Sequence, residues 1–405
     1  MESPVTNPEQ RAPLVYDPYL YEIHENPYPV YRRMRDEAPV YYNPRLDFYA
    51  LTRFQDCLDA LLDWERYSSA SGTVLELMTG QPLPGNMMIF MDPPRQTRYR
   101  NLVNKAFTKA RVDQLEEVIR KLAVGHLDAL EGRSSFDAVR DFTAKLPMDV
   151  ISTLLGIPDC DRDMVREWSN AVLHREPGSP HVTPAGLRAM AETQVYYQKA
   201  LDERRARPRD DLMSALVQAR VHEDDGTVSL LSDDDIRSFF TLLATAGNET
   251  VTKLLATALY WLPRFPDERR ALLEDPALLP NAVEELLRFD PPSHYQGRTL
   301  TRDVTLHGTT MPAGARVMIV NGSSGRDERR FRDPDRLDVR RAIDVHLGFG
   351  YGRHFCLGAS LARMEMRIGL EEFLRRWPAY AAPDEGVERM HSSNVRGLCG
   401  LRIEV

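Results

Sequence analysis

A single cysteine in a glycine-rich loop is the residue best placed to do chemistry. Residues 349–358 read Phe-Gly-Tyr-Gly-Arg-His-Phe-Cys-Leu-Gly, so Cys356 stands directly before a predicted helix. The free N–H groups and the positive dipole end of a helix N-terminus favour a thiolate. Glycines in the loop let the backbone approach something flat and large. A thiolate held in this way suits an axial position of a haem iron.

Other interpretations of Cys356 have to be weighed. A lone cysteine is usually a buried structural residue. The pattern F-x-x-G-x-H-x-C-x-G has five fixed positions, however, and chance would produce it with a probability of only ~10⁻⁴ in a chain of this length. The other chemical interpretation is a cysteine hydrolase that uses Cys356 and His354.

A polar segment interrupts the apolar stripe of the longest predicted helix, residues 232–264. It reads Ala246-Gly247-Asn248-Glu249-Thr250. Glycine costs about 1 kcal/mol relative to alanine inside a helix. Taken alone, the segment fits a packing notch with a solvated turn as well as it fits a functional site.

Together, these two segments resemble the cytochrome P-450 superfamily, the haem-thiolate monooxygenases. The resemblance extends from about Asp17 to the C-terminus and is closest to the soluble bacterial members. It implies haem b as the cofactor and Cys356 as the proximal iron ligand. It also implies that the helix crosses the distal face of the haem, that a gap there admits dioxygen, and that Glu249 and Thr250 deliver protons. Glu249 stands where aspartate is commoner in the family.

The resemblance also implies a structural trio of charged residues. Glu285 and Arg288 are three residues apart on a predicted helix, so their charges can pair, although most such pairs are ordinary helix surface. In the family this pair is buried and locks an arginine from the segment before the cysteine loop. The matching segment is Pro-Asp-Arg-Leu, residues 334–337, with leucine in place of the usual phenylalanine. We therefore expect Arg336 to complete the trio.

Cations are expected to bind the haem carboxylates. Residues 92–100, Asp-Pro-Pro-Arg-Gln-Thr-Arg-Tyr-Arg, resemble the family segment D-P-P-x-H-x-R-x-R, with Gln96 in place of the usual histidine. The resemblance assigns Arg100, Arg298 and His354 to the propionates. Arginine suits carboxylates because it binds them through two parallel hydrogen bonds. Each of these residues alone would be read as a surface cation.

The substrate pocket is assigned by the same resemblance. Methionines adapt to varied apolar ligands, although core packing explains each of them equally well. His294 is a titratable group in an otherwise apolar place, and it bonds either a backbone carbonyl or a polar end of the substrate. The expected lining residues are Met87, Met88, Leu242, Thr245, Ala246, His294 and Val395.

Hydrophobic periodicity predicts a mainly α fold with small β-sheets. It predicts helices over 110–131, 147–155, 161–174, 184–206, 232–264 and 357–377, and strands over 299–306 and 316–320. No repeat or linker divides the chain, so we expect one domain over residues 1–405, with the haem between the long central helix and the cysteine loop. The Glu-Pro-Gly-Ser-Pro segment at 176–180 splits two helices and is expected to be a mobile lid.

Composition excludes several classes of protein. The net charge of −8, from 52 Lys+Arg against 60 Asp+Glu, argues against non-specific binding of nucleic acid. The four cysteines include no C-x-x-C pair, which excludes zinc ribbons and c-type haem attachment. There is no signal peptide and no long uncharged apolar run, so we expect a cytoplasmic protein without a membrane partner.

The resemblance, together with these observations, implies a haem-dependent monooxygenase. It would hydroxylate or epoxidise a lipophilic small molecule with O2, using electrons from a separate ferredoxin and its reductase. The alternatives are a peroxide-using or non-oxygenative haem-thiolate enzyme, and a haem carrier without catalysis, which would need no acid–alcohol pair. The expected docking patch for an acidic ferredoxin, which could also be a solvated helix face, consists of Arg95, Arg98, Arg100, Lys105, Lys109, Arg111 and Arg363.

Overall fold

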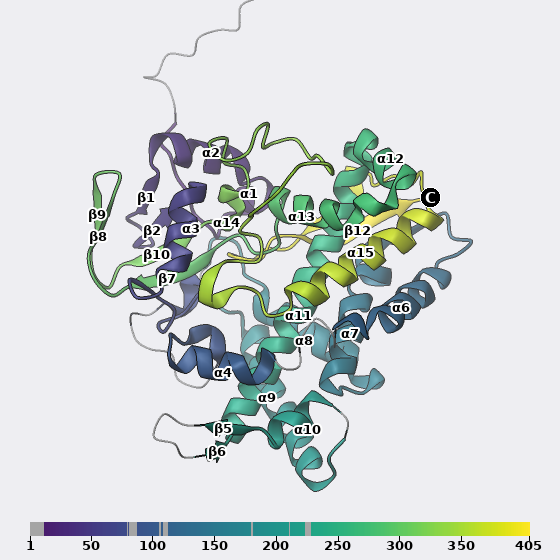
Figure 1. Ribbon diagram of the computed structural model, residues 1–405. Coiled ribbons are helices and arrows are strands. Elements are labelled where there is room, and N and C mark those ends of the chain that lie inside the picture. The colour runs from purple at the N-terminus through teal and green to yellow at the C-terminus, as the bar shows by residue number, and fades with distance from the viewer. Residues whose placement is uncertain are drawn as a thin grey trace, which may run out of the picture.

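The computed structural model describes residues 12–78, 80, 87–104, 107, 112–179, 181–209, 211–222 and 228–405. Helices form most of the described chain, and the largest β-sheet lies to one side of them (Figure 1). The predicted mainly α fold with small sheets is therefore confirmed. The single domain over residues 1–405 stays a prediction, because part of the chain lies outside the described residues.

The helices that frame the site differ widely in length. The α-helices of the described residues are α1 (Tyr21–Glu25), α2 (Tyr28–Glu37), α3 (Phe54–Leu62), α4 (Arg95–Asn104), α6 (Glu116–Asp128), α7 (Lys145–Leu155), α8 (Arg162–Leu173), α9 (Pro184–Ala206), α10 (Leu212–Val217), α11 (Asp233–Trp261), α12 (Pro266–Glu274), α13 (Leu279–Phe289), α14 (Asn321–Ser324) and α15 (Ala359–Arg376). Short 3₁₀ turns that bear on the site are η2 (Leu75–Leu77), η3 (Met88–Phe90) and η8 (Gly352–His354). No helix of these ranges is both long enough and apolar enough to cross a membrane.

The strands form four small sheets. They are β1 (Val40–Asn43), β2 (Phe48–Leu51), β3 (Tyr67–Ser68), β4 (Ser135–Asp137), β5 (Arg220–His222), β6 (Val228–Leu230), β7 (Gln296–Leu300), β8 (Val304–Leu306), β9 (Thr309–Met311), β10 (Arg316–Ile319), β11 (Val387–Arg389) and β12 (Leu398–Glu404). The largest sheet has the order β1-β2-β10-β7-β3, and β10 runs parallel to β2 but antiparallel to β7. In this sheet Arg298 lies on β7 opposite Val317.

The central helix α11 passes through the middle of the molecule, behind α15 in Figure 1. Ser232 caps it, because its hydroxyl accepts from Asp235 N–H at 3.2 Å while the Asp235 carboxylate accepts from Ser232 N–H at 2.8 Å. This is the capping box that the sequence predicts. Acidic residues in the first turn also complement the positive end of the helix dipole.

Helix α11 connects two apolar cores. Its first half packs with α7, α8 and α9 through residues such as Phe239 and Phe240, and its second half packs with α6, α13 and α15 through Leu254 and Leu255. The polar segment 246–250 lies between these two cores. The folding energy of both cores therefore fixes the position of this segment.

Most predicted helices match the structure within a few residues, but the strand predicted over 299–306 is wrong. The chain leaves the large sheet after Leu300 and starts a separate β8–β9 hairpin at Val304. The tight turn of that hairpin uses His307 and Gly308, whose φ angles are 50° and 78°. A segment with strand propensity along its length does not show where the chain passes from one sheet to another.

Candidate active site

The cysteine loop is held by its own backbone. Cys356 N–H donates to the Phe349 carbonyl at 2.9 Å, and the Gly358 N–H donates to the Cys356 sulfur. Gly352 has a φ of 68°, which favours glycine. A Cβ at Gly352 would also lie 2.8 Å from the carbonyl oxygen of Leu61. The close neighbour of this glycine is thus the end of α3, and the loop is seated on that helix.

Helix α4 holds the cysteine loop from a second side. Gln96 is buried and donates to the Arg353 carbonyl at 2.8 Å, and Arg100 Nη1 donates to the same oxygen at 3.3 Å. An amide replaces the histidine usual at position 96 in the family. In this chain it ties α4 to the loop at Arg353, one residue before His354 and three residues before Cys356.

Arg298 is a buried cation without an ion-pair partner among the described residues. Its side chain is on β7, the residue is 3% exposed, and its Nη1 donates to the Gly297 carbonyl at 2.7 Å. Among the described residues no carboxylate lies within ion-pair distance of it, and the nearest acid that influences it, Asp92, accepts from Ser69 N–H at 2.9 Å. Burial lowers the pKa of Arg298 to about 10. Such a buried guanidinium calls for an anion.

His354 and Arg100 share the surroundings of Arg298. The Nε2 atom of His354 lies 3.2 Å from the hydroxyl of Ser69. Burial first, and then the positive fields of Arg298 and Arg100, lower the pKa of His354 to about 3. The structure thus brings the three predicted propionate ligands together around one positive region.

The thiol of Cys356 is not activated as a free nucleophile. Burial raises its pKa, against the opposing influence of the Gly358 N–H and the positive charges of Arg100 and Arg363. His354 bonds Ser69, and no hydrogen bond joins it to Cys356 within the described residues. A hydrolase needs the reverse arrangement, with a base on a low-pKa thiol. A bound metal ion would instead supply the charge that deprotonates the sulfur.

An open face interrupts the buried surface of α11. Ala246 is exposed and Leu242, Thr245 and Thr250 are partly exposed, at the spacing of three to four residues that defines one helix face. The hydroxyl of Thr250 donates back to the Ala246 carbonyl at 2.8 Å. Leu357, the neighbour of the cysteine, packs against the apolar cluster that α11 shares with α7 to α9. The open face and the cysteine loop are thus joined through one cluster.

Gly247 serves helix packing. A Cβ at this position would lie 3.1 Å from the side chain of Ile151 on α7, so a larger residue would push the two helices apart. The structure therefore supports the packing-notch interpretation of this glycine, and the gap for dioxygen stays a prediction.

Glu249 lies apart from the open face. It is 2% exposed, and its Oε2 is 3.3 Å from Nζ of Lys253, one turn further along α11. Asn248 Nδ2 donates to its Oε1 at 3.2 Å. The side-chain amide of Asn170 on α8, oriented by its hydrogen bonding, donates to both carboxylate oxygens at 3.0 Å. Glu249 and Thr250 are thus adjacent in sequence but point in different directions.

The buried pair Glu285–Arg288 is present, but its third partner differs from the prediction. Arg288 donates through Nε and Nη2 to the two Glu285 oxygens at 2.6 and 2.7 Å, and both side chains are fully buried. Arg341 Nε donates to Glu285 Oε1 at 3.2 Å. The side chain of Arg336 is 68% exposed and approaches only Glu268, at 3.6 Å.

The assignment of Arg336 is therefore wrong at the level of the side chain. Arg336 sits in a turn closed by its N–H to the Asp333 carbonyl, which directs its own carbonyl inward. That carbonyl accepts from Arg288 Nη2 at 3.2 Å and from Arg341 Nη2 at 3.1 Å. The backbone of residue 336 thus belongs to the structural group, and the third guanidinium comes from Arg341.

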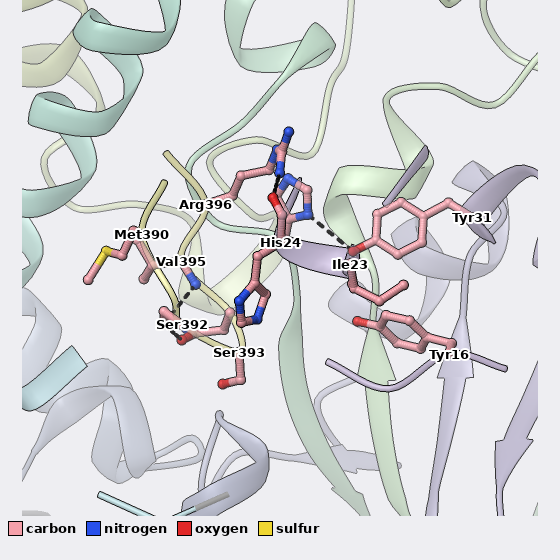
Figure 2. A pocket seen from close by; sticks show the side chains of 11 residues that line it. Tyr16, Ile23, His24, Tyr31, Met390, Ser392, Ser393, Val395 and Arg396 are labelled. Carbon is pink, nitrogen blue, oxygen red and sulfur yellow. Dashed lines mark hydrogen bonds between the residues drawn. The ribbon is translucent and has the colours of Figure 1, made fainter. Parts of the chain in front are cut away.

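His294 and Val395 line a different cavity from the open face of α11. This cavity holds about 20 Å³ and is lined by Tyr31, Ser392, Val395 and Arg396 among others, as Figure 2 shows. His294 Nδ1 lies 3.1 Å from the Tyr31 hydroxyl, and burial lowers the pKa of His294 to about 4. A space of this size admits about one water molecule. The structure places both residues at this small cavity, and their part in the substrate pocket stays a prediction.

The two methionines before α4 have different surroundings. Met88 is buried in the cluster formed by α7, α8, α9 and α11, which makes it a core residue. Met87 is partly exposed, next to the 3₁₀ turn η3. Of the predicted pocket residues, Met87, Leu242, Thr245 and Ala246 keep accessible surface inside the fold.

Haem fits these surroundings on three grounds. A cysteine sulfur is presented at the start of α15 with a backbone N–H as its hydrogen-bond partner. Arg298 and Arg100 form a positive region without a paired carboxylate among the described residues, with the neutral His354 beside them, and two propionates would fill it. An accessible apolar face on α11 lies between two packed cores. A flat dianion with an iron at its centre satisfies all three.

The sequence did not predict three contacts at the site: those of Asn170 and Lys253 with Glu249, and that of Arg341 with Glu285. Lys253 carried a usable signal, because it lies four residues after Glu249 on one helix face. Asn170 and Arg341 come from distant segments and carried none.

Comparison with known proteins agrees with this geometry. The family profile described as Cytochrome P450 matches residues 188–399. A protein named Putative cytochrome P450 123 from Mycobacterium tuberculosis is 45% identical over 395 residues, which is 97% of each chain. The Vitamin D(3) 25-hydroxylase of Pseudonocardia autotrophica is 37% identical over 96% of each chain.

Solved structures show the same likeness. The structure of CYP109E1 from Bacillus megaterium in complex with testosterone aligns with a TM-score of 0.86 and 31% identity, and the alignment covers 95% of this chain and 98% of that one. The chain belongs to the cytochrome P450 family, whose members are haem-dependent monooxygenases.

Proposed function

We propose that this cytochrome P450 inserts one oxygen atom of O2 into a lipophilic small molecule, by hydroxylation or epoxidation, with electrons from a ferredoxin and its reductase. The observation that carries the proposal is the buried, uncompensated Arg298 beside Arg100, His354 and the cysteine loop. Bound haem would supply the iron chemistry that activates dioxygen. The protein supplies the ligand, the binding of the carboxylates, the dry surroundings and the protons.

Each residue of the site has a definite task in this proposal. Cys356 is the proximal ligand, and the N–H of Gly358 tunes the electron donation of its sulfur. Arg298, Arg100 and His354 bind the propionates. Thr250 lies on the open face of α11 and hands protons to the distal side, while Glu249 draws them from the surroundings of α8.

The substrate class follows from the lining of the open face. Leu242, Ala246 and Met87 offer apolar surface, and Thr245 offers one hydroxyl. One similar protein was solved in complex with testosterone, and another is named Vitamin D(3) 25-hydroxylase, and both molecules are lipophilic. A compact lipophilic substrate with few polar groups would match the mainly apolar surface that these residues offer.

The electron donor is proposed to dock beside α4. Arg95, Arg98 and Arg100 lie on α4, next to the cysteine loop that Arg100 contacts. Arg363 is less available, because Glu284 accepts from its Nε at 2.6 Å and from its Nη2 at 2.9 Å. Lys105, Lys109 and Arg111 lie outside the described residues. The cytoplasmic location stays a prediction.

Labelled dioxygen and the spectrum of the carbon monoxide complex test the function. The reduced, carbon monoxide-bound protein should show the red-shifted Soret band of thiolate ligation, and Cys356→His should lose it while Cys57→Ala and Cys160→Ala keep it. With ferredoxin, reductase and a compound that perturbs the haem spectrum, one labelled oxygen should enter the product. Product that forms only with added peroxide would overturn the proposal.

A further inference from the structure

A cleft of about 310 Å³ lies between α4 and the β5–β6 hairpin, which is below α4 in Figure 1. It is separate from the site described above, because it contains no residue of the cysteine loop and none of the open face of α11. Its volume lies at the lower end of the range of small-molecule sites, about 300–1,000 Å³. The residues that matter are Arg95, Arg98 and Tyr99 on one side and Leu230, Leu231 and Asp235 on the other.

The inner wall of the cleft joins α4 to the start of α11. The ring centroid of Tyr99 lies 5.8 Å from that of Phe239 on α11, and the Tyr99 hydroxyl donates to Asp235 Oδ1 at 2.6 Å. Asp235 Oδ2 accepts from the N–H and the hydroxyl of Ser232 at 2.8 and 2.7 Å. Three donors and the positive end of the helix dipole thus offset the charge of Asp235, so this buried carboxylate repels an anion in the cleft only weakly.

The α4 wall of the cleft is cationic. Arg95 and Arg98 are three residues apart, which places them on one face of the helix, and both line the cleft. The guanidinium carbon of Arg95 lies 5.6 Å from the centroid of the Tyr99 ring. Each guanidinium has five N–H donors, so it can bind a ligand in addition to its protein partners. Two such groups one turn apart suit a carboxylate, which accepts paired hydrogen bonds.

The hairpin wall of the cleft is apolar. Leu230 is 64% exposed, and Val228, which points to the same side of β6, is exposed as well. Leu231 follows directly and is buried in the cluster that α11 shares with α7, α8 and α9. A ligand that covers exposed aliphatic side chains gains about 25 cal/mol for each Å² of apolar surface removed from water. The cleft therefore offers cations on one side and apolar surface on the other.

We propose that this cleft binds a small molecule with one carboxylate and a compact apolar body, with the carboxylate at Arg95 and Arg98 and the body against Leu230. Binding in the cleft does not depend on the proposed oxygenation reaction. Its consequence rests on the proposed docking of the electron donor beside α4, which uses the same two arginines. A bound carboxylate would offset their charge, so we expect it to slow the first electron transfer at low salt.

Calorimetric titration of the holoenzyme with 2-naphthoate tests the proposal. A saturating azole that ligates the haem iron is present throughout, so that the probe cannot enter the distal pocket. We expect one molecule of 2-naphthoate to bind per protein. Acetate, which lacks the apolar body, and naphthalenemethanol, which lacks the charge, should each bind about tenfold more weakly or less.

Variants of the two walls locate the probe. Arg98→Met should weaken the binding of 2-naphthoate about tenfold or more, and Leu230→Ser about fivefold. Arg95→Met covers the case in which Arg98→Met prevents folding, which the Soret band of the carbon monoxide complex reports. The matched controls are Arg188→Met and Leu187→Ser, because both residues are exposed on the first turns of α9, outside the cleft. Both control variants should bind the probe as the wild type does.

Three results would overturn the proposal: no binding of 2-naphthoate in the presence of the azole, binding that Arg98→Met and Leu230→Ser leave unchanged, or binding of hexaglutamate in place of 2-naphthoate with the same dependence on Arg98. The last result would assign the cleft to an acidic protein. Stopped-flow reduction by a ferredoxin separates the cleft from the proposed docking surface. If 2-naphthoate binds in the cleft and leaves the rate of reduction unchanged, the cleft stands and the docking beside α4 fails.

Discussion

Arg341, and not Arg336, is the third charged side chain of the buried group with Glu285 and Arg288, so replacing these two arginines should affect stability very differently. Arg341 is 11% exposed, donates to Glu285 at 3.2 Å and also reaches the carbonyls of Asp333 and Arg336 at 3.2 and 3.1 Å. The side chain of Arg336 is 68% exposed and stands 3.6 Å from Glu268. Replacement of each by methionine keeps most of the side-chain volume and removes the charge.

The magnitudes follow from burial. Arg341→Met leaves Glu285 with Arg288 as its remaining cation and orphans several carbonyls, so we expect a loss of about 2–4 kcal/mol. Arg336→Met removes one exposed contact at long range and should cost about 0–1 kcal/mol. For a protein whose net stability is on the order of 10 kcal/mol, the first loss is large and the second is close to the limit of measurement.

Urea titration of the holoenzyme, followed by the Soret band of the carbon monoxide complex, measures both losses side by side. The midpoint should fall clearly in Arg341→Met and stay near wild type in Arg336→Met. Equal midpoints for the two variants, or a larger fall in Arg336→Met, would refute the assignment of Arg341. Because the comparison is relative, it stands even if unfolding is not fully reversible.

Three further predictions use other parts of the structure. Thr250→Ala should keep haem content and ligand binding while product per electron falls and peroxide rises, and normal coupling would mean that protons take another route. Glu365 is fully buried without a hydrogen-bond partner among the described residues. Burial raises its pKa well above the ordinary 4.5. Between these two pKa values the folded protein therefore binds one proton more than the unfolded chain. Stability should therefore fall by up to about 1.4 kcal/mol per pH unit as pH rises above 4.5, and Glu365→Gln should remove that slope in urea titrations at several pH values. In this conformation Arg175 Nε pairs with Glu76 at 3.0 Å, and Gly178 N–H donates to the Tyr19 carbonyl at 3.0 Å. If the segment closes over a bound ligand, these contacts should break less often, so amide exchange over 174–179 should slow when the ligand is saturating. Unchanged exchange would count against lid closure.

Local signals in the sequence were sufficient for the helices and the cysteine loop. Ser232 and Asp235 are separated by the capping-box interval, and Gly156 ends α7 in the left-handed conformation, as its position after the apolar stripe predicts. Cys356 was identified because its motif is local. Arg100, Arg298 and His354 were grouped through the resemblance and not through spacing; the structure brings them together, and their role as propionate ligands stays a prediction.

The errors share one physical cause, which is that side-chain direction depends on distant contacts. Arg336 carries the expected residue type, but a turn exposes its guanidinium and buries its carbonyl. The surroundings of His294 could not be predicted either: its ring packs against Tyr31, and a Cβ on Gly322 would lie 2.9 Å from it. Neither turn geometry nor packing against a segment 28 residues further on is visible in the local sequence.

The two sides of the cysteine loop use charge in opposite ways. On one side Arg288 and Arg341 both pair with Glu285 within the protein, so the buried carboxylate there has its partners before any cofactor binds. On the other side Arg298 is buried without a carboxylate among the described residues, and its desolvation lowers its pKa to about 10. Binding of a dianionic cofactor to such a cation stabilises the folded state by mass action. The protein therefore has a rigid frame for the cysteine loop, and we expect a haem carboxylate to compensate the desolvated Arg298.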